Sequence, residues 1–187
     1  MDYFRICNDV IEIFNEVERE IRHFKNSTAI ECVEFCGGEC CNKEDIFATI
    51  LEFIPLAFHL HNINKAEEKY YLLKSKGDKI CILYDKENSG RCEYYEYRGL
   101  VCRLFGFASI RLKDNSPSMV TCRFIKSRYI RQIESQLNPI VMADYQRRLM
   151  AIDIELGCRF YPINEAIQKA IEKIGLYIMV KDFLSQE

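Results

Sequence analysis

The chain has 187 residues, a formal net charge of −2 and 49% hydrophobic residues. This length is sufficient for one domain with its own hydrophobic core. The charge gives no electrostatic case for nucleic-acid binding, which needs a basic surface excess. No segment reaches the roughly 20 apolar residues that span a bilayer, and the first 20 residues lack the features of a targeting signal. We therefore expect a cytoplasmic protein with neither nucleic acid nor membrane as a partner, and leave a protein partner open.

The first third of the chain is predicted to be mostly helical. Apolar residues recur at helical spacing from Asp2 to Phe24, which predicts a long amphipathic helix that docks on the rest of the domain. A second, largely buried helix is expected from Ile46 to Leu60. Pro55 should kink it or split it into two pieces, because proline lacks an amide donor and clashes with the preceding turn. Lys65 to Lys76 is expected to form a third helix.

A small β element is predicted in the middle of the chain. Lys79 to Tyr84 and Cys92 to Tyr97 read as two short β-like runs separated by turn residues. If they form a hairpin, Cys81 and Cys92 lie close together. Leu100 to Leu112 could hold a third strand, and Met119 to Cys122 a short return strand.

The last third of the chain is predicted to be helical again. We expect helices at Ser127 to Leu137, from Pro139 to about Leu156, and from Pro162 to Gly175, with Leu176 to Leu184 as a short final helix or strand. The fold class is therefore mainly α (α+β), a helical domain with a small irregular β-hairpin element. We expect one domain over 1–187, in which 32–122 carries the cysteines and a C-terminal helical part, 127–187, packs on it.

The number of cysteines is unusual for such a chain. In a reducing compartment clustered thiols favour metal binding over disulfides. Cys7 and Cys158 stand alone in helical patterns and fit the ordinary use of cysteine as a small buried apolar residue. The other eight are grouped: Cys32, Cys36, Cys40, Cys41, Cys81, Cys92, Cys102 and Cys122.

The densest group lies in the sequence C-V-E-F-C-G-G-E-C-C, from Cys32 to Cys41. Gly37 and Gly38 permit turns that other residues disfavour, and they leave room for N–H groups to approach sulfur. A disulfide between the adjacent Cys40 and Cys41 would be strained. In an extended backbone their side chains point in opposite directions, so one could serve one centre and the other a second centre or the core.

Basic residues accompany the later cysteines. Four thiolates around Zn²⁺ or around a [4Fe–4S]²⁺ cluster leave a net charge of −2, whose burial requires donors or cations nearby. Arg91, Arg98, Arg103 and Arg123 each lie within a few residues of a cysteine. We expect Arg98 and Arg103 to be the two that surround the site, while the others are equally consistent with surface charges.

The segment R-C-E-Y-Y-E-Y-R-G-L-V-C-R-L-F-G-F, preceded by C-I-L-Y-D, resembles a family of zinc- or iron-chelating cysteine-cluster proteins, the YkgJ-like or CxxCxxCC family. That family has a C-x-x-C-G-x-C-C loop, a helical stretch, a C-x-x-L segment, C-x-I-Y-E-x-R-P-x-x-C-R-x-F and a final cysteine. The matching positions are Cys81, Leu83, Tyr84, Cys92, Tyr95, Glu96, Arg98, Cys102, Arg103, Phe105 and Cys122.

Two departures from the family pattern stand out. Gly99 replaces the proline after Arg98, which should loosen the turn without removing a ligand. The first motif is one residue longer in each gap, so Cys32 corresponds least well to a family cysteine.

The resemblance implies a metal-binding protein that uses some or all of the eight grouped cysteines, with Arg98, Arg103, Gly37 and Gly38 around them. The cofactor is zinc or an iron–sulfur cluster, of which a [4Fe–4S] cluster is favoured. Two alternatives stay open, of which the first is implied by a related cysteine cluster in flagellin lysine N-methylases. One is an iron–sulfur enzyme for redox or S-adenosylmethionine-dependent protein methyl transfer. The other is a metal or redox sensor.

Overall fold

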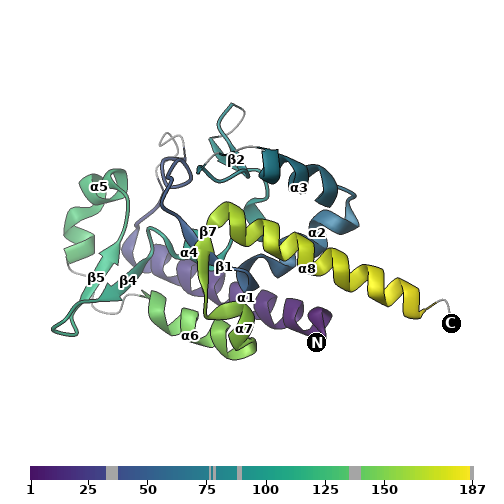
Figure 1. Ribbon diagram of the computed structural model, residues 1–187. Coiled ribbons are helices and arrows are strands. Elements are labelled where there is room, and N and C mark those ends of the chain that lie inside the picture. The colour runs from purple at the N-terminus through teal and green to yellow at the C-terminus, as the bar shows by residue number, and fades with distance from the viewer. Residues whose placement is uncertain (33–37, 76, 78, 88–89, 135–139, 186–187) are drawn as a thin grey trace.

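The computed structural model describes residues 1–32, 38–75, 77, 79–87, 90–134 and 140–185 (Figure 1). Helices make up 60% of it, and the strands within these ranges form three small sheets, two with two strands and one with three. The predicted class, mainly α with a minor β part, is confirmed. Among the described residues, no helix is both long and apolar enough to cross a lipid bilayer.

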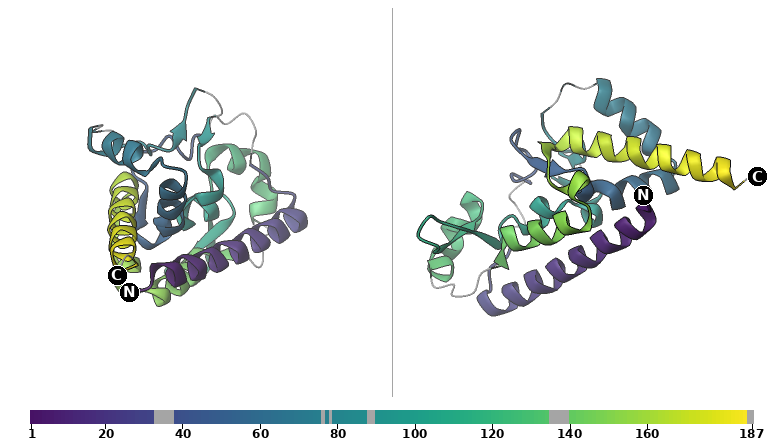
Figure 2. Two further views of the ribbon diagram at one scale, coloured as in Figure 1. Left: turned by 90° about the vertical axis from the view of Figure 1, so that its right-hand side faces the viewer. Right: turned by 60° about the horizontal axis from the view of Figure 1, so that its bottom comes forward.

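The first helix, α1, covers Tyr3–Thr28 and runs along one side of the molecule (Figures 1 and 2). The Asp2 carboxylate accepts hydrogen bonds from the amides of Phe4 and Arg5, which satisfies donors that an unprotected helix start leaves open. The helix extends one turn beyond the predicted end and closes at Ala29, whose φ is 56°. Most of its predicted apolar face is buried, but the predicted Phe4 and Ile11 are exposed and Ile6 and Ile13 are buried in their place. The buried residues are Ile6, Cys7, Val10, Ile13, Phe14, Val17, Ile21 and Phe24.

The centre of the core is α2, Ile54–Asn62, which contacts both α1 and α8 (Ile163–Leu184). The single helix predicted from Ile46 is wrong in its first half. That part forms strand β1 (Phe47–Thr49), which pairs antiparallel with β7 (Phe160–Pro162), followed by the 3₁₀ turn η1 (Leu51–Phe53). Pro55 explains the difference, because proline suits the first turn of α2 and disfavours a helix that continues through it.

The predicted hairpin exists but is shorter than expected. After α3 (Ala66–Ser75), strand β2 (Tyr84–Asp85) pairs antiparallel with β3 (Arg91–Cys92). Tyr84 lies opposite Cys92, so Cys81 precedes the first strand rather than lying in it. The second predicted run continues as a 3₁₀ turn, η2 (Tyr95–Tyr97).

The third predicted strand is wrong in its first half, where α4 (Leu100–Leu104) forms instead. Strand β4 (Ala108–Arg111) follows, between β5 (Pro117–Val120), antiparallel, and β6 (Ile140–Val141), parallel. Leu100 and Leu104 are fully buried, a spacing of four that suits a helix face turned to the core. The later helices are α5 (Arg123–Glu134), α6 (Met142–Ile152) and α7 (Ile154–Gly157). Pro139 lies outside the described residues.

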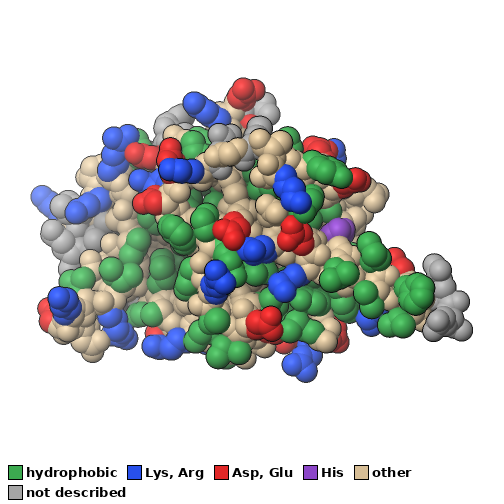
Figure 3. All heavy atoms as spheres, viewed as in Figure 1, with side chains coloured by type: hydrophobic (Ala, Val, Ile, Leu, Met, Phe, Trp, Pro, Cys, Tyr) green, Lys and Arg blue, Asp and Glu red, His purple; other side chains and the backbone are tan. Residues whose placement is uncertain are grey.

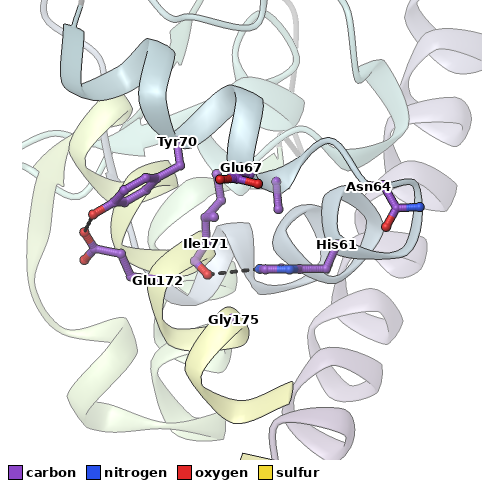
Figure 4. Close-up of a pocket in the computed structure, with 8 residues that line it drawn as sticks. His61, Asn64, Glu67, Tyr70, Ile171, Glu172 and Gly175 are labelled. Carbon is purple, nitrogen blue, oxygen red and sulfur yellow. Dashed lines mark hydrogen bonds between the residues drawn. The ribbon is translucent and has the colours of Figure 1, made fainter. Parts of the chain in front are cut away.

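The final helix does not end at Gly175 as predicted; α8 continues to Leu184. Glycine is disfavoured inside a helix, so its presence needs a reason. A Cβ atom at Gly175 would lie 3.1 Å from Cε1 of His61, and the His61 Nε2 is 3.2 Å from the carbonyl oxygen of Ile171, one turn earlier (Figure 4). The glycine therefore provides space for an imidazole that packs against α8.

We expect this packing to appear as coupling between two substitutions. Gly175→Ala should raise the free energy of unfolding by about 1 kcal/mol in a His61→Ala background, because alanine is the better helix former. With His61 present, the same substitution should raise the free energy of unfolding less, or lower it, because the new methyl group contacts the imidazole ring. Urea denaturation of the four proteins measures the coupling. Equal effects in both backgrounds would contradict this explanation.

Candidate metal centre

The described part of the first cysteine segment is a tight turn. The amide of Cys41 donates to the carbonyl oxygen of Gly38 at 2.7 Å, and Gly38 has a φ of 68°. The Cys40 and Cys41 sulfurs lie 4.0 Å apart as free thiols. The expected opposite orientation of these thiols is wrong, because the backbone turns here instead of extending. Cys36 and Gly37 lie outside the described residues.

Gly38 also brings the first cysteine segment against the β2–β3 hairpin. A Cβ atom on Gly38 would lie 1.8 Å from the Gly90 carbonyl oxygen and 2.8 Å from Cε2 of Tyr84. Only glycine permits so close an approach of two backbones. Because Cys92 lies in β3, two regions some 50 residues apart in the chain carry their cysteines to the same part of the molecule.

The later cysteines form a coupled group. The thiols of Cys81 and Cys92 interact electrostatically with each other and with the thiol of Cys102, which lies on α4. Burial raises the pKa of Cys81 to about 12, and it also raises the pKa values of Cys92 and Cys102. These thiols therefore remain protonated at neutral pH unless a bound metal displaces their protons.

Arg98 is the positive charge shared by both cysteine regions. A larger effect raises the pKa of each of three thiols: the hydrogen bond with Cys41 for Cys40, and burial for Cys92 and Cys102. The charge of Arg98 acts in the opposite direction and lowers all three pKa values. The guanidinium carbon lies 3.5 Å from the centre of the Tyr95 ring, and Nε donates to the Tyr95 carbonyl oxygen at 2.9 Å. The group is thus held in place beside the thiols.

Arg103, the residue after Cys102, is buried and fixes the second motif to the rest of the protein. Its guanidinium donates to the carbonyl oxygens of Glu96 and Arg98, the latter at 2.9 Å, and to the Glu18 carboxylate of α1 at 2.6 Å. It also lies 4.4 Å from the centre of the Phe14 ring. Such planar multidentate binding suits arginine and could not be reproduced by lysine.

Glu52 is a functional candidate that the sequence pattern did not single out. Its buried carboxylate accepts hydrogen bonds from the amide and hydroxyl of Thr49, at 2.8 and 3.1 Å, and from the amide of Val101 at 3.2 Å. Val101 belongs to the first turn of α4, so Glu52 caps the helix that carries Cys102. Burial raises the pKa of Glu52, and its charge adds to the rise in the pKa of Cys102. The sequence feature that could have indicated Glu52 is the presence of an acidic residue within an otherwise apolar segment.

Gly99 has the geometry that the family's proline would impose. Its φ is −62°, within the range fixed by a proline ring, so the glycine does not change the backbone conformation. A Cβ atom there would lie 3.0 Å from Oε2 of Glu52 and 3.1 Å from the Phe53 ring. The glycine therefore lets the Glu52 carboxylate approach α4 closely.

Of the remaining predicted ligands, Cys122 lies next to a residue that contacts the first cysteine segment. Cys122 precedes α5, and its sulfur lies 3.5 Å from the amide nitrogen of Ile125. The next residue, Arg123, pairs with Glu39 of the first cysteine segment at 3.0 Å, which links the two segments. Cys32 is exposed. Within the described ranges, no three His, Cys, Asp or Glu side chains are arranged as a ready coordination shell.

Substitution at Gly38 should separate the two cysteine regions. Gly38→Ala places a methyl group on the Gly90 carbonyl and strains a left-handed backbone, so we expect the free energy of unfolding to fall by at least about 2 kcal/mol. Gly77→Ala is the matched control, because nothing lies within 4 Å of its Cβ position. Urea denaturation measures both variants. Equal stability of the two would show that the contact between the turn and the hairpin is unimportant.

Thiol reactivity should follow burial. After removal of metal by a chelator, Cys81 should react with iodoacetamide far more slowly at pH 8 than the exposed Cys158. The raised pKa of Cys81 means that its thiolate fraction is small at pH 8 and grows as the pH rises toward 12. Pulsed alkylation followed by peptide mass spectrometry gives both rates. Similar rates for the two thiols would contradict the raised pKa and the partial burial of Cys81.

A comparison with known proteins gives one match. A family model, CxxCxxCC, with the description "Putative zinc- or iron-chelating domain", matches residues 31–129, just over half of the chain. No curated protein and no solved structure matches. The matched range begins before Cys32 and ends after Cys122, so it includes all eight grouped cysteines. The chain therefore belongs to the CxxCxxCC family of zinc- or iron-chelating domains.

Proposed function

We propose that this protein holds a zinc ion or an iron–sulfur cluster through cysteine thiolates, with a [4Fe–4S] cluster as the favoured occupant. The observation that supports this most strongly is the contact of Gly38 with Gly90, which brings the turn of Cys40 and Cys41 against the hairpin that carries Cys92. The charge of Arg98 also acts on Cys40 and Cys92, against larger effects that raise their pKa values. Two cysteine regions far apart in sequence thus share one cation. The family's chelating character agrees with this proposal.

The proposed central ligands are Cys40, Cys81, Cys92 and Cys102. They are the thiols coupled to one another or to Arg98, and each is partly buried. The proposed ligand set also includes the cysteines of the surrounding segments, which could complete a larger or second centre: Cys32, Cys36, Cys41 and Cys122.

The donor set fits such a group chemically. Thiolates are the preferred ligands of both zinc and iron–sulfur clusters. The raised pKa values of the buried thiols mean that binding must release protons, so binding is favoured as the pH rises. Arg98 and Arg103 would offset part of the −2 charge that four thiolates leave on either occupant. Bound zinc would be structural, whereas a cluster would supply electron-transfer chemistry.

Two features favour the cluster over zinc. One is the pair of adjacent thiols in the first cysteine segment, Cys40 and Cys41, whose sulfurs lie 4.0 Å apart. Gly37 and Gly38 sit between cysteines, where backbone N–H groups can approach sulfur and tune a cluster. We also propose that 1–187 acts as one domain, because a common core cluster includes residues of α1, α2, α4, α6 and α8.

The metal can be identified by purifying the protein without oxygen and measuring iron, acid-labile sulfide and zinc per chain. The proposal predicts a brown protein with about four iron and four sulfide. A colourless protein with stoichiometric zinc would contradict the iron–sulfur cluster but agree with a thiolate metal site. Absence of any metal would contradict the proposed function.

The ligand assignment can be tested separately with Cys102→Ser, which should lose at least about half of the bound metal, because the hydroxyl is a poor replacement for a thiolate. Cys158→Ser is the control, since Cys158 is exposed and does not belong to the eight grouped cysteines. Circular dichroism checks that both variants keep their helices. Full metal content in folded Cys102→Ser would remove Cys102 from the ligand set.

A further inference from the structure

The outward face of α8 changes character halfway along the helix. In its first half this face carries Glu165, Lys169 and Glu172, of which the first two pair at 3.5 Å. The same row of positions, spaced by three or four residues, continues as Leu176, Val180 and Phe183. A solvated face therefore becomes an apolar one where the helix extends past the body of the protein (Figure 1).

The apolar half of this row is strongly exposed. Figure 3 shows hydrophobic side chains gathered over the projecting end of α8. We call five of these residues the α8 stripe. Their exposed fractions are as follows: Leu176 64%, Met179 69%, Val180 48%, Phe183 67% and Leu184 61%. Soluble surfaces rarely group so many large apolar side chains without a partner.

The side of the helix that borders these residues is already in use. The Tyr177 ring packs edge-on against Tyr3 and Phe4 of α1, with ring centres 5.3 and 5.7 Å apart. Lys181 lies over the Tyr177 ring at 5.7 Å. Tyr177 and the partly buried Ile178 thus make the contacts with the body of the protein, and the α8 stripe remains exposed beside them.

We propose that the α8 stripe is a homodimer interface, in which α8 pairs antiparallel with α8 of a second copy of this chain. The two-fold axis lies between Met179 and Val180. Leu176 then faces Phe183 of the partner subunit, and Met179 faces Val180 of the partner subunit. Such a contact is self-complementary, as a two-fold interface must be. The bodies of the two copies lie at opposite ends of the helix pair.

The exposed area is consistent with a dimer. The five side chains expose on the order of 600 Å² per chain, taking roughly 200 Å² for a large apolar side chain. Two copies would therefore bury about 1,200 Å², the lower end of the range for specific interfaces. The spacing of Leu176, Met179 and Phe183 by three and then four residues also matches the seam of paired helices.

The charges near the stripe favour a second copy over a lipid surface. A helix that binds membranes usually carries many lysines and arginines on its polar face. Lys181 and Asp182 lie side by side on the polar side of this segment, and the whole chain has a net charge of −2. Nothing in the stripe itself is charged, so two copies approach without like-charge repulsion.

Sedimentation equilibrium of the full-length, metal-loaded protein tests the proposal. Wild type should behave as a dimer at micromolar concentration, twice the chain mass of 22.1 kDa. Met179→Glu and Val180→Lys should each raise the dimer dissociation constant at least about tenfold, because each buries a charge against an apolar partner. The double variant Met179→Glu/Val180→Lys should recover much of the affinity, since each new carboxylate faces a new ammonium across the axis.

Ile154→Lys is the control, because Ile154 is 71% exposed but lies on α7, outside the stripe. It should leave the dimer and the metal content unchanged. A monomeric wild type at 100 times the working concentration would overturn the proposal, as would binding of monomers to neutral phosphatidylcholine vesicles through the stripe. Failure of the double variant to recover affinity, with both single variants folded, would overturn the antiparallel register.

Discussion

The arrangement of the cysteines depends on one close contact between two glycines. Gly38 adopts a left-handed backbone conformation and lies directly against the carbonyl group of Gly90. Any side chain at position 38 would hold the first cysteine segment away from the β2–β3 hairpin. With the contact in place, Cys40 and Cys92 lie in the field of the same guanidinium, that of Arg98. A single residue without a side chain thus joins the two halves of the motif.

Buried polar groups then fix the second half of the site. Arg103 binds backbone carbonyl oxygens of the preceding turn and a carboxylate on α1, so the long N-terminal helix acts as a support for the cysteine region. Glu52 caps α4 through the amide of Val101. Loss of one partner of such a buried network leaves the other without compensation, so both residues contribute to the position of Cys102. This explains why arginine follows the cysteine in the motif.

Periodicity predicted the long elements well and the short ones poorly. The helical spacing predicted α1 and most of its buried side, though Phe4 and Ile11 are exposed. The segment from Ile46 and the segment from Leu100 were misassigned, because short apolar runs suit a strand or a helix equally and tertiary contacts decide. Gly175 predicted a helix end, but the glycine provides space for His61, a contact 114 residues away in sequence. The roles of Glu52 and Glu18 depend on similar long-range contacts and leave no local pattern.

Metal-edge X-ray absorption on the anaerobically purified protein tests the central claim most directly, that cysteines from both regions bind one centre. The account predicts that sulfur alone surrounds the metal, at about 2.3 Å if the metal is zinc. It also predicts that Cys40→Ser and Cys92→Ser each remove sulfur from that shell, since one ligand comes from each region. A metal surrounded by nitrogen and oxygen would contradict the proposed thiolate site. A sulfur shell that stays unchanged in either folded variant would contradict a centre shared by both regions.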